Sequence, residues 1–191
     1  MKNILFKVSG VVLILLVILV IFHLYKYLDK TNIYEITQQK LDFIDGNKLY
    51  MNKDPLIITF IEDISFKNNI DNYFLKTALT RKEKYITLDL VENYMSHKSE
   101  ICLIRPITDT VITLVNPKFS KYFNYINKDK NFKFSNLEKD KYSDVQSIDI
   151  VLHRHNIFSV PRFWLFKFDN KCKIETYLSH NIFTQLFSIF I

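Results

Sequence analysis

Glycine is almost absent from this chain of 191 residues, which contains only Gly10 and Gly46. The phosphate-binding loops of nucleotide-binding families need several glycines close together, because their backbone must approach the phosphates closely. The sequence therefore excludes a site of that class. Tight turns must instead use Asn and Asp, which tolerate the left-handed backbone conformation better than most residues.

Cysteine is also scarce, with only Cys102 and Cys172 present. Both stand in apolar, strand-like surroundings and lack the spacing of metal ligands, which favours two small core residues. A disulfide between them is the alternative.

Charge is missing from one long segment near the N-terminus. Residues 8–25, VSGVVLILLVILVIFHLY, include no Asp, Glu, Lys or Arg, and as a helix they would extend roughly 27 Å, close to the thickness of the bilayer hydrocarbon. A cleaved signal peptide is the alternative, with Lys2 and Lys7 as its basic start, but large residues follow the run where cleavage needs small ones. We therefore predict a single-pass anchor over residues 1–26. Its flanking lysines are balanced and leave the orientation open.

The net charge of +6 is less informative than it looks. Lys2, Lys7 and Lys26 flank the apolar run, so half of the positive excess belongs to the anchor and not to the soluble part. The remainder is too small to indicate binding to DNA or RNA. The expected partners are a membrane and other proteins, and not nucleic acid.

Residues 27–46 have apolar side chains at helical intervals, with Asn32 as a possible N-cap and Glu35 three residues later. Gly46 stands where a helix would stop. We predict a stalk or linking helix here, followed by one domain over residues 47–191.

Short runs rich in Ile, Val, Thr and aromatic residues predict that this domain is mainly β with a few helices. Helical spacing in IDNYFLKTAL predicts a helix over residues 70–79. Thr108–Asp109 and Asp169–Lys171 predict the turns of two hairpins. The predicted strands cover residues 55–61, 85–91, 100–106, 110–117, 147–153, 156–168 and 172–178.

Residues 118–141 differ from the rest, because seven lysines alternate with aromatic residues there. One interpretation is a solvated connection that places its aromatic rings on the core. The other is a contact surface for an anionic partner or lipid, where lysines meet phosphate and rings stack or insert. The candidate contact residues are Lys118, Lys121, Tyr122, Lys128, Lys130 and Lys133.

The order of the strands resembles that of the cupin domains related to the JmjC and asparaginyl-hydroxylase family. KDPLIITFIEDI, TVITLVNPKFSKYF and IDIVLHRHNIFSVPRFWLFKF follow one another as in that family, over about residues 53–191. NIFSVPRFWLF is similar to the family's late element with a Pro and a Trp. The resemblance implies a double-stranded β-helix, which is a jelly roll of two facing sheets.

Active members of that family hold iron with a His-x-Asp/Glu pair and a distant His, leaving positions for 2-oxoglutarate and oxygen. This chain has no His-x-Asp or His-x-Glu, and Leu165 and Phe166 stand where the resemblance would place the distant His. The resemblance thus implies a domain that has lost its iron. The remaining metal candidates are His97, His153 and His155, of which the last two would share a face of a strand. As the alternative, His153 and His155 mark a loop or the end of a strand before Asn156, and the histidines carry no chemistry.

These observations support a non-enzymatic, membrane-anchored structural or interaction protein without a cofactor. The composition, rich in Lys, Asn and Ile, is similar to that of proteins from AT-rich large DNA viruses. It suggests a virion membrane or minor capsid component, in the virion membrane or a host endomembrane. Two alternatives stay open: a divergent oxygenase that uses Fe(II) and 2-oxoglutarate, and a membrane-tethered module that binds an anionic partner through residues 118–141.

Overall fold

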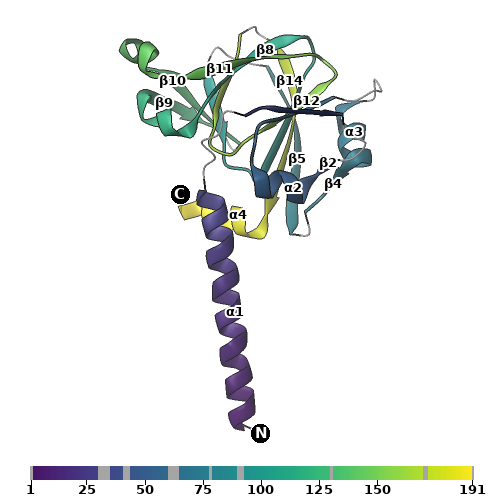
Figure 1. Cartoon of the computed structure of the whole chain (residues 1–191), viewed down its shortest axis with the longest axis vertical. Helices are drawn as coiled ribbons and strands as arrows, with labels where there is room; N and C mark the ends of the chain where they lie inside the picture. Colours follow the sequence, from purple (N-terminus) through teal and green to yellow (C-terminus); the bar gives the residue numbers. More distant parts are fainter. Residues whose placement is uncertain are drawn as a thin grey trace.

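The computed structural model describes residues 2–29, 35–40, 44–59, 65–77, 79–89, 93–129, 131–169 and 172–190. It shows one long helix, α1 (Lys2–Leu28), that projects from a β-rich domain (Figure 1). The predicted mainly β fold behind an N-terminal helix is therefore confirmed.

Helix α1 has the length and composition needed to cross a membrane. Its segment Val8–Leu28 has 21 residues and a mean hydropathy of 2.8, and only 6% of its most apolar window is buried against the protein. All side chains from Val8 to Phe22 are exposed. The predicted long apolar helix is confirmed, although it ends at Leu28 and not at residue 26.

Two six-stranded sheets make up most of the described part of the domain. The first has the order β1 (Thr37–Lys40), β3 (Leu56–Thr59), β12 (Asn156–Val160), β7 (Ile101–Pro106), β14 (Lys173–Asn181) and β5 (Thr80–Asp89). The second has the order β11 (Ser147–Leu152), β8 (Thr110–Val115), β13 (Leu165–Phe168), β6 (Tyr94–His97), β10 (Phe132–Leu137) and β9 (Phe123–Lys128). Apart from the parallel β1–β3 pair, neighbouring strands in both sheets are antiparallel.

Successive strands alternate between the two sheets. From β5 to β8 the chain changes sheet at every connection, and it does so again from β11 to β14. The two predicted hairpins are therefore wrong: the strands before and after Thr108–Asp109, and before and after Asp169, belong to different sheets. A short turn between two apolar runs is equally compatible with a hairpin and with a crossing between sheets, because only the partner strands decide it.

The main core lies between the sheets, where apolar side chains from both of them meet. Trp164 is fully buried in this core together with Phe158, Phe166 and Leu178. Cys102 and Cys172 are free thiols and also belong to it, so the predicted small core residues are confirmed.

The stretch 156–168 is not one strand as predicted. Strand β12 ends at Val160 in the first sheet, and β13 begins at Leu165 in the second. Between them the backbone turns through Phe163, which has a φ of 68°. Pro161 cannot donate a hydrogen bond to a neighbouring strand, which ends the first ladder.

A second apolar cluster covers the outer face of the first sheet. Helices α2 (Gly46–Asn52) and α3 (Phe66–Tyr73) lie there beside a small parallel pair, β2 (Ile44–Asp45) and β4 (Phe74–Leu75). Gly46 is required at this point, because a Cβ would come within 2.7 Å of the Leu75 carbonyl oxygen. The glycine therefore permits a close approach at the start of α2, and it does not end a helix as predicted.

Two helix predictions need correction. In the predicted stalk, residues 27–28 are the end of α1, while the described residues 35–40 and 44–46 contain β1, β2 and the start of α2. The two strands pair with β3 and β4 of the domain. The predicted helix at 70–79 is instead α3, which begins after its N-cap Ser65 and ends at Tyr73. Pairing of Phe74 and Leu75 with β2 overrides their helical spacing.

The lysine-rich segment 118–141 has regular structure. It contains the 3₁₀ helix η1 (Pro117–Tyr122), the antiparallel pair β9–β10, and the start of the 3₁₀ helix η2 (Lys139–Asp144). This β9–β10 hairpin extends the second sheet beyond β6, and Figure 1 shows it projecting from the upper left of the domain, above the level at which α1 ends. The C-terminal helix α4 (Ile182–Phe190), which the sequence analysis missed, lies across the domain end of α1.

Candidate functional site

The most elaborate polar arrangement in the described residues lies where α1 meets the domain. The last carbonyl groups of a helix have no partners within the helix, and its C-terminal end carries a partial negative charge. Here two cationic side chains from the domain supply both hydrogen-bond donors for these carbonyls and positive charge near the end of the helix. Arg162 and Lys53 donate hydrogen bonds to backbone carbonyls at the end of α1.

Arg162 is positioned by the turn between β12 and β13, and it is 5% exposed. Its Nη1 donates to the Tyr27 carbonyl at 3.1 Å, and its Nε donates to the Ser99 carbonyl at 3.0 Å. The guanidinium also lies 4.4 Å from the centre of the Tyr27 ring, a favourable position for a cation over an aromatic face. Burial lowers the pKa of Arg162 from its ordinary value, but an arginine keeps its charge at any physiological pH.

Lys53 follows α2 with a left-handed backbone, at a φ of 53°. This conformation ends α2 and directs the side chain toward α1. Its ammonium group donates to the carbonyls of Lys26 and Asp29, the latter at 3.0 Å, and lies 3.8 Å from the Asp29 carboxylate. Burial, and then the nearby Arg162, lower the pKa of Lys53 to about 8.

Glu100 is the acidic member of this cluster and is 7% exposed. Its Oε1 accepts a hydrogen bond from Asn181 at 3.1 Å, and Asn181 in turn accepts from the backbone and hydroxyl of Thr184 in the first turn of α4. Its Oε2 has no hydrogen-bond partner among the described residues. Burial raises the pKa of Glu100 to about 7, against the opposing effect of Arg162.

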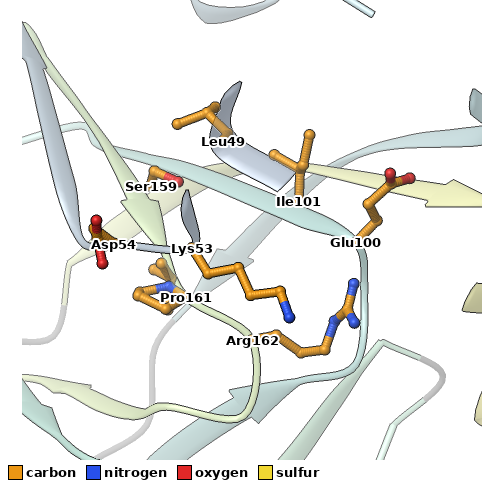
Figure 2. Close-up of a pocket in the computed structure, with 9 residues that line it drawn as sticks. Leu49, Lys53, Asp54, Glu100, Ile101, Ser159, Pro161 and Arg162 are labelled. Atoms are coloured by element: carbon orange, nitrogen blue, oxygen red, sulfur yellow. The ribbon is translucent and has the colours of Figure 1, made fainter. Parts of the chain in front are cut away.

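A small cavity of about 10 Å³ lies among these groups, room for about one water molecule. Figure 2 shows the charged ends of Lys53 and Arg162 pointing into the same space, while the carboxylate of Glu100 extends away from the guanidinium. The two cations therefore act mainly on α1, and the carboxylate acts on the start of α4. We call the set Lys53, Glu100, Arg162 and Asn181 the junction cluster.

Aromatic packing completes the junction. The ring of His23 in α1 stacks on Phe183 of α4 at 4.2 Å, and its Nδ1 lies 3.2 Å from the hydroxyl of Tyr50 in α2. Tyr27 meets Phe187 of α4 at 5.6 Å and Phe163 at 5.8 Å. The final turns of α1 are thus held from α2, from the β12–β13 turn and from α4.

The structure places the three candidate metal-ligand histidines in different surroundings. His97 ends β6, is 1% exposed, and has its Nε2 at 3.1 Å from the Val160 carbonyl. An imidazole in this contact must carry its proton on Nε2, and burial lowers the pKa of His97 to about 3. Its imidazole is therefore neutral at physiological pH.

His153 and His155 lie in the turn after β11, as the interpretation without metal chemistry predicted, and do not share the face of a strand. His153 is exposed, with its Nδ1 at 3.0 Å from the Asp109 carboxylate, while Nε2 of His155 accepts a hydrogen bond from Arg154. Over the part of the chain that the structure describes, no group of three His, Cys, Asp or Glu residues is arranged to hold a metal ion.

The candidate contact residues on the β9–β10 hairpin are brought together only in part. Lys118, Lys121 and Lys133 are exposed, and each ammonium group lies over an aromatic ring, at 4.9, 4.9 and 5.2 Å from the ring centre. Tyr122 is half-buried under Lys121. Lys130 and the side chain of Lys128 lie outside the described residues.

Sequence reasoning missed the junction cluster entirely, because charged residues in separate segments are most simply assigned to the surface. One signal was present: Arg162 is the only charged residue in the otherwise apolar stretch 156–166. A lone charge in a stretch buried on both faces indicates a buried polar contact.

No protein-family model matches this chain, and no curated protein matches its sequence significantly.

Proposed function

We propose that this protein is a membrane-anchored interaction protein without enzymatic activity, in which α1 crosses a bilayer and holds a jelly-roll domain at the membrane surface. The observation that carries the proposal is the capping of α1 by Lys53 and Arg162. An anchor that serves only as a tether needs no buried contacts with the domain behind it. Here the end of the helix is built into the domain, which fixes the domain relative to the membrane.

The strand order supports the jelly-roll, cupin-like form of the domain. The strands that alternate between the sheets, β5 to β8 and then β11 to β14, can be numbered one to eight along the chain. In this numbering one sheet has the order one, eight, three, six. The other has the order two, seven, four, five. This order is the one expected of a double-stranded β-helix, in which the β9–β10 hairpin would be an insertion between the fourth and fifth strands.

The β9–β10 hairpin is the proposed contact surface for a protein partner. Three exposed lysines, Lys118, Lys121 and Lys133, combine there with the exposed ring of Tyr125. A patch of cations over aromatic rings suits an acidic protein surface, because the rings supply contact area and the lysines supply attraction. The hairpin lies above the level at which α1 ends (Figure 1), which favours a soluble partner over the lipid of the same membrane.

A photo-crosslinking experiment in native membranes tests this proposal. A photoreactive residue replaces Tyr125 in the full chain, and crosslinked partners are compared with those of Lys118→Glu/Lys121→Glu/Lys133→Glu carrying the same probe. A control with the same change of charge reverses Lys40, Lys48 and Lys173, which are exposed elsewhere. We expect a defined partner that is lost in the hairpin variant, retained in the control, and weakened by salt.

Two results would contradict the proposal. The first is identical crosslinking by the hairpin and control variants. The second is extraction of the unmodified chain from membranes by alkaline carbonate, because a spanning helix resists it.

A virion membrane or minor capsid role is the more specific form of the same proposal, and its support is the composition of the chain alone. The oxygenase alternative stays a hypothesis, which iron analysis tests.

A further inference from the structure

Helix α4 contains no charged residue in its sequence IFTQLFSIF. Its two faces have different environments. Phe183 and Phe187 pack on His23 and Tyr27 of α1. Ile182 and Leu186, which are one helical turn apart, are 41% and 49% exposed. Two large apolar side chains thus lie together on a helix face that no described residue covers.

The contacts with α1 fix the level of α4 relative to a bilayer. Its partners on α1 are His23 and Tyr27, in the last turns of the membrane-length segment Val8–Leu28. A helix of this length extends roughly 31 Å, so its end reaches the boundary between hydrocarbon and headgroups. Figure 1 shows α4 lying across α1 at this end, and not continuing along it.

The residues beside α4 also include exposed apolar, lysine and tyrosine side chains. Leu79, which is 42% exposed, directly precedes β5, and the first residue of β5, Thr80, pairs with Asn181 at the start of α4. Exposed Lys82 follows, opposite His180. Tyr25 of α1 is 66% exposed at the same level. Apolar, tyrosine and lysine side chains in one layer are typical of a protein surface that lies in the headgroup region.

We propose that α4 is a second membrane contact, an interfacial helix that inserts Ile182 and Leu186 among the lipids of the bilayer that α1 crosses. The inference rests on the proposed function, since it needs α1 to span a membrane. Lipid is the occupant because α4 packs on His23 and Tyr27, directly after the exposed apolar side chains of α1 that end at Phe22. With α1 and α4 both in contact with lipid, the domain cannot rotate about the end of α1, and the β9–β10 hairpin is held away from the membrane.

Tryptophan fluorescence in vesicles tests this contact. Trp164 is the only tryptophan of the chain and is fully buried in the core, so it supplies a constant background. The full chain with Leu186→Trp is reconstituted into phosphatidylcholine vesicles whose acyl chains are brominated near the headgroup. The matched control is Val151→Trp, because Val151 is a 60% exposed apolar residue on β11. Ile182→Trp provides a second test position on α4.

We expect the tryptophans at positions 182 and 186 to emit at short wavelength and to be quenched by the brominated lipid, and the one at 151 to stay unquenched. A third variant, Leu15→Trp in α1, reports on the span itself with lipid brominated deeper in the chain. Quenching at 15 without quenching at 182 and 186 would overturn the interfacial helix and leave the anchor intact. Absence of quenching at 15 would instead overturn the proposed function.

Discussion

Arg162 and Tyr27 are 135 residues apart in the sequence, yet the guanidinium of Arg162 both donates to the Tyr27 carbonyl and lies over the Tyr27 ring. One side chain therefore donates a hydrogen bond to a carbonyl at the end of α1 and also makes a cation–π contact with the ring of the same residue. This pair ties the beginning of the chain to a turn near its end.

Replacing Arg162 by Met should destabilise the chain, because the Tyr27 and Ser99 carbonyls would stay buried without donors. We expect a loss of about 2–4 kcal/mol in the free energy of unfolding. Chemical denaturation of the full chain in micelles measures it. Arg154→Met is the matched control, since Arg154 is exposed. An equal loss of unfolding free energy in both variants would show that the buried hydrogen bonds of Arg162 stabilise the chain no more than an exposed arginine does.

Glu100→Gln should change how stability depends on pH. The pKa of Glu100 is about 7 in the folded chain against an ordinary 4.5, so the folded state binds the proton more tightly than the unfolded one. Its contribution is therefore complete below about pH 4.5 and is lost as the pH rises through about 7. Relative to the Gln variant, the unmodified chain should lose on the order of 2–3 kcal/mol across this range.

Comparison of the two proteins at each pH isolates Glu100. The pKa values of His97 and His180 are lowered to about 3 and about 4 by burial, so these groups give the opposite slope, but they do so in both proteins. A stability difference that stays constant from about pH 4.5 to 7.5 would show that Glu100 keeps an ordinary pKa.

Trp164→Ala should remove the largest side chain of the main core, which is fully buried between the sheets. We expect a cost of about 3–5 kcal/mol, enough to unfold a domain of ordinary stability. A thermal melt of the purified variant measures it. An unchanged midpoint would contradict the packing described for the core.

Replacing His153 and His155 together by Asn should alter stability by no more than about 1 kcal/mol, because their described contacts are at the surface. Bound metal, measured by elemental analysis of chain purified without a His tag, should be at background in both proteins. Stoichiometric iron in the unmodified chain that disappears in the double variant would support the oxygenase hypothesis instead.

The strands β3, β5, β7, β8 and β11 to β14 were predictable from the sequence because they lie in short runs of β-branched and aromatic residues, as in Thr110–Val115 and Ser147–Leu152. Their partners were not, since the turn at Thr108–Asp109 contains no information about which sheet the next strand joins. The short strand β6 was not predicted, and β1, β2 and β4 fell where helices were predicted. The β9–β10 hairpin was missed because its lysines and asparagines conceal the alternation of Phe132 and Phe134 with polar residues.

The junction cluster could not be derived from local patterns. Lys53, Glu100 and Arg162 stand in three separate segments, and each has a composition typical of a surface or a turn. Only the folded chain brings them to the end of α1. Their role depends on the unpaired carbonyls of that helix, which every helix has and which no sequence motif marks.

The alternation of strands between sheets has a consequence for how the chain acquires its structure. Strand β5 has β14 as its partner in the first sheet, and the Arg162 turn that caps α1 is itself a crossing between the sheets. Contacts between residues so distant in sequence form late, because a long loop must close before they give any stability. During synthesis, which proceeds from the N-terminus, α1 is made before Arg162, so the final carbonyls of α1 must wait for their donor. The end of α1 is thus made well before the turn that completes it.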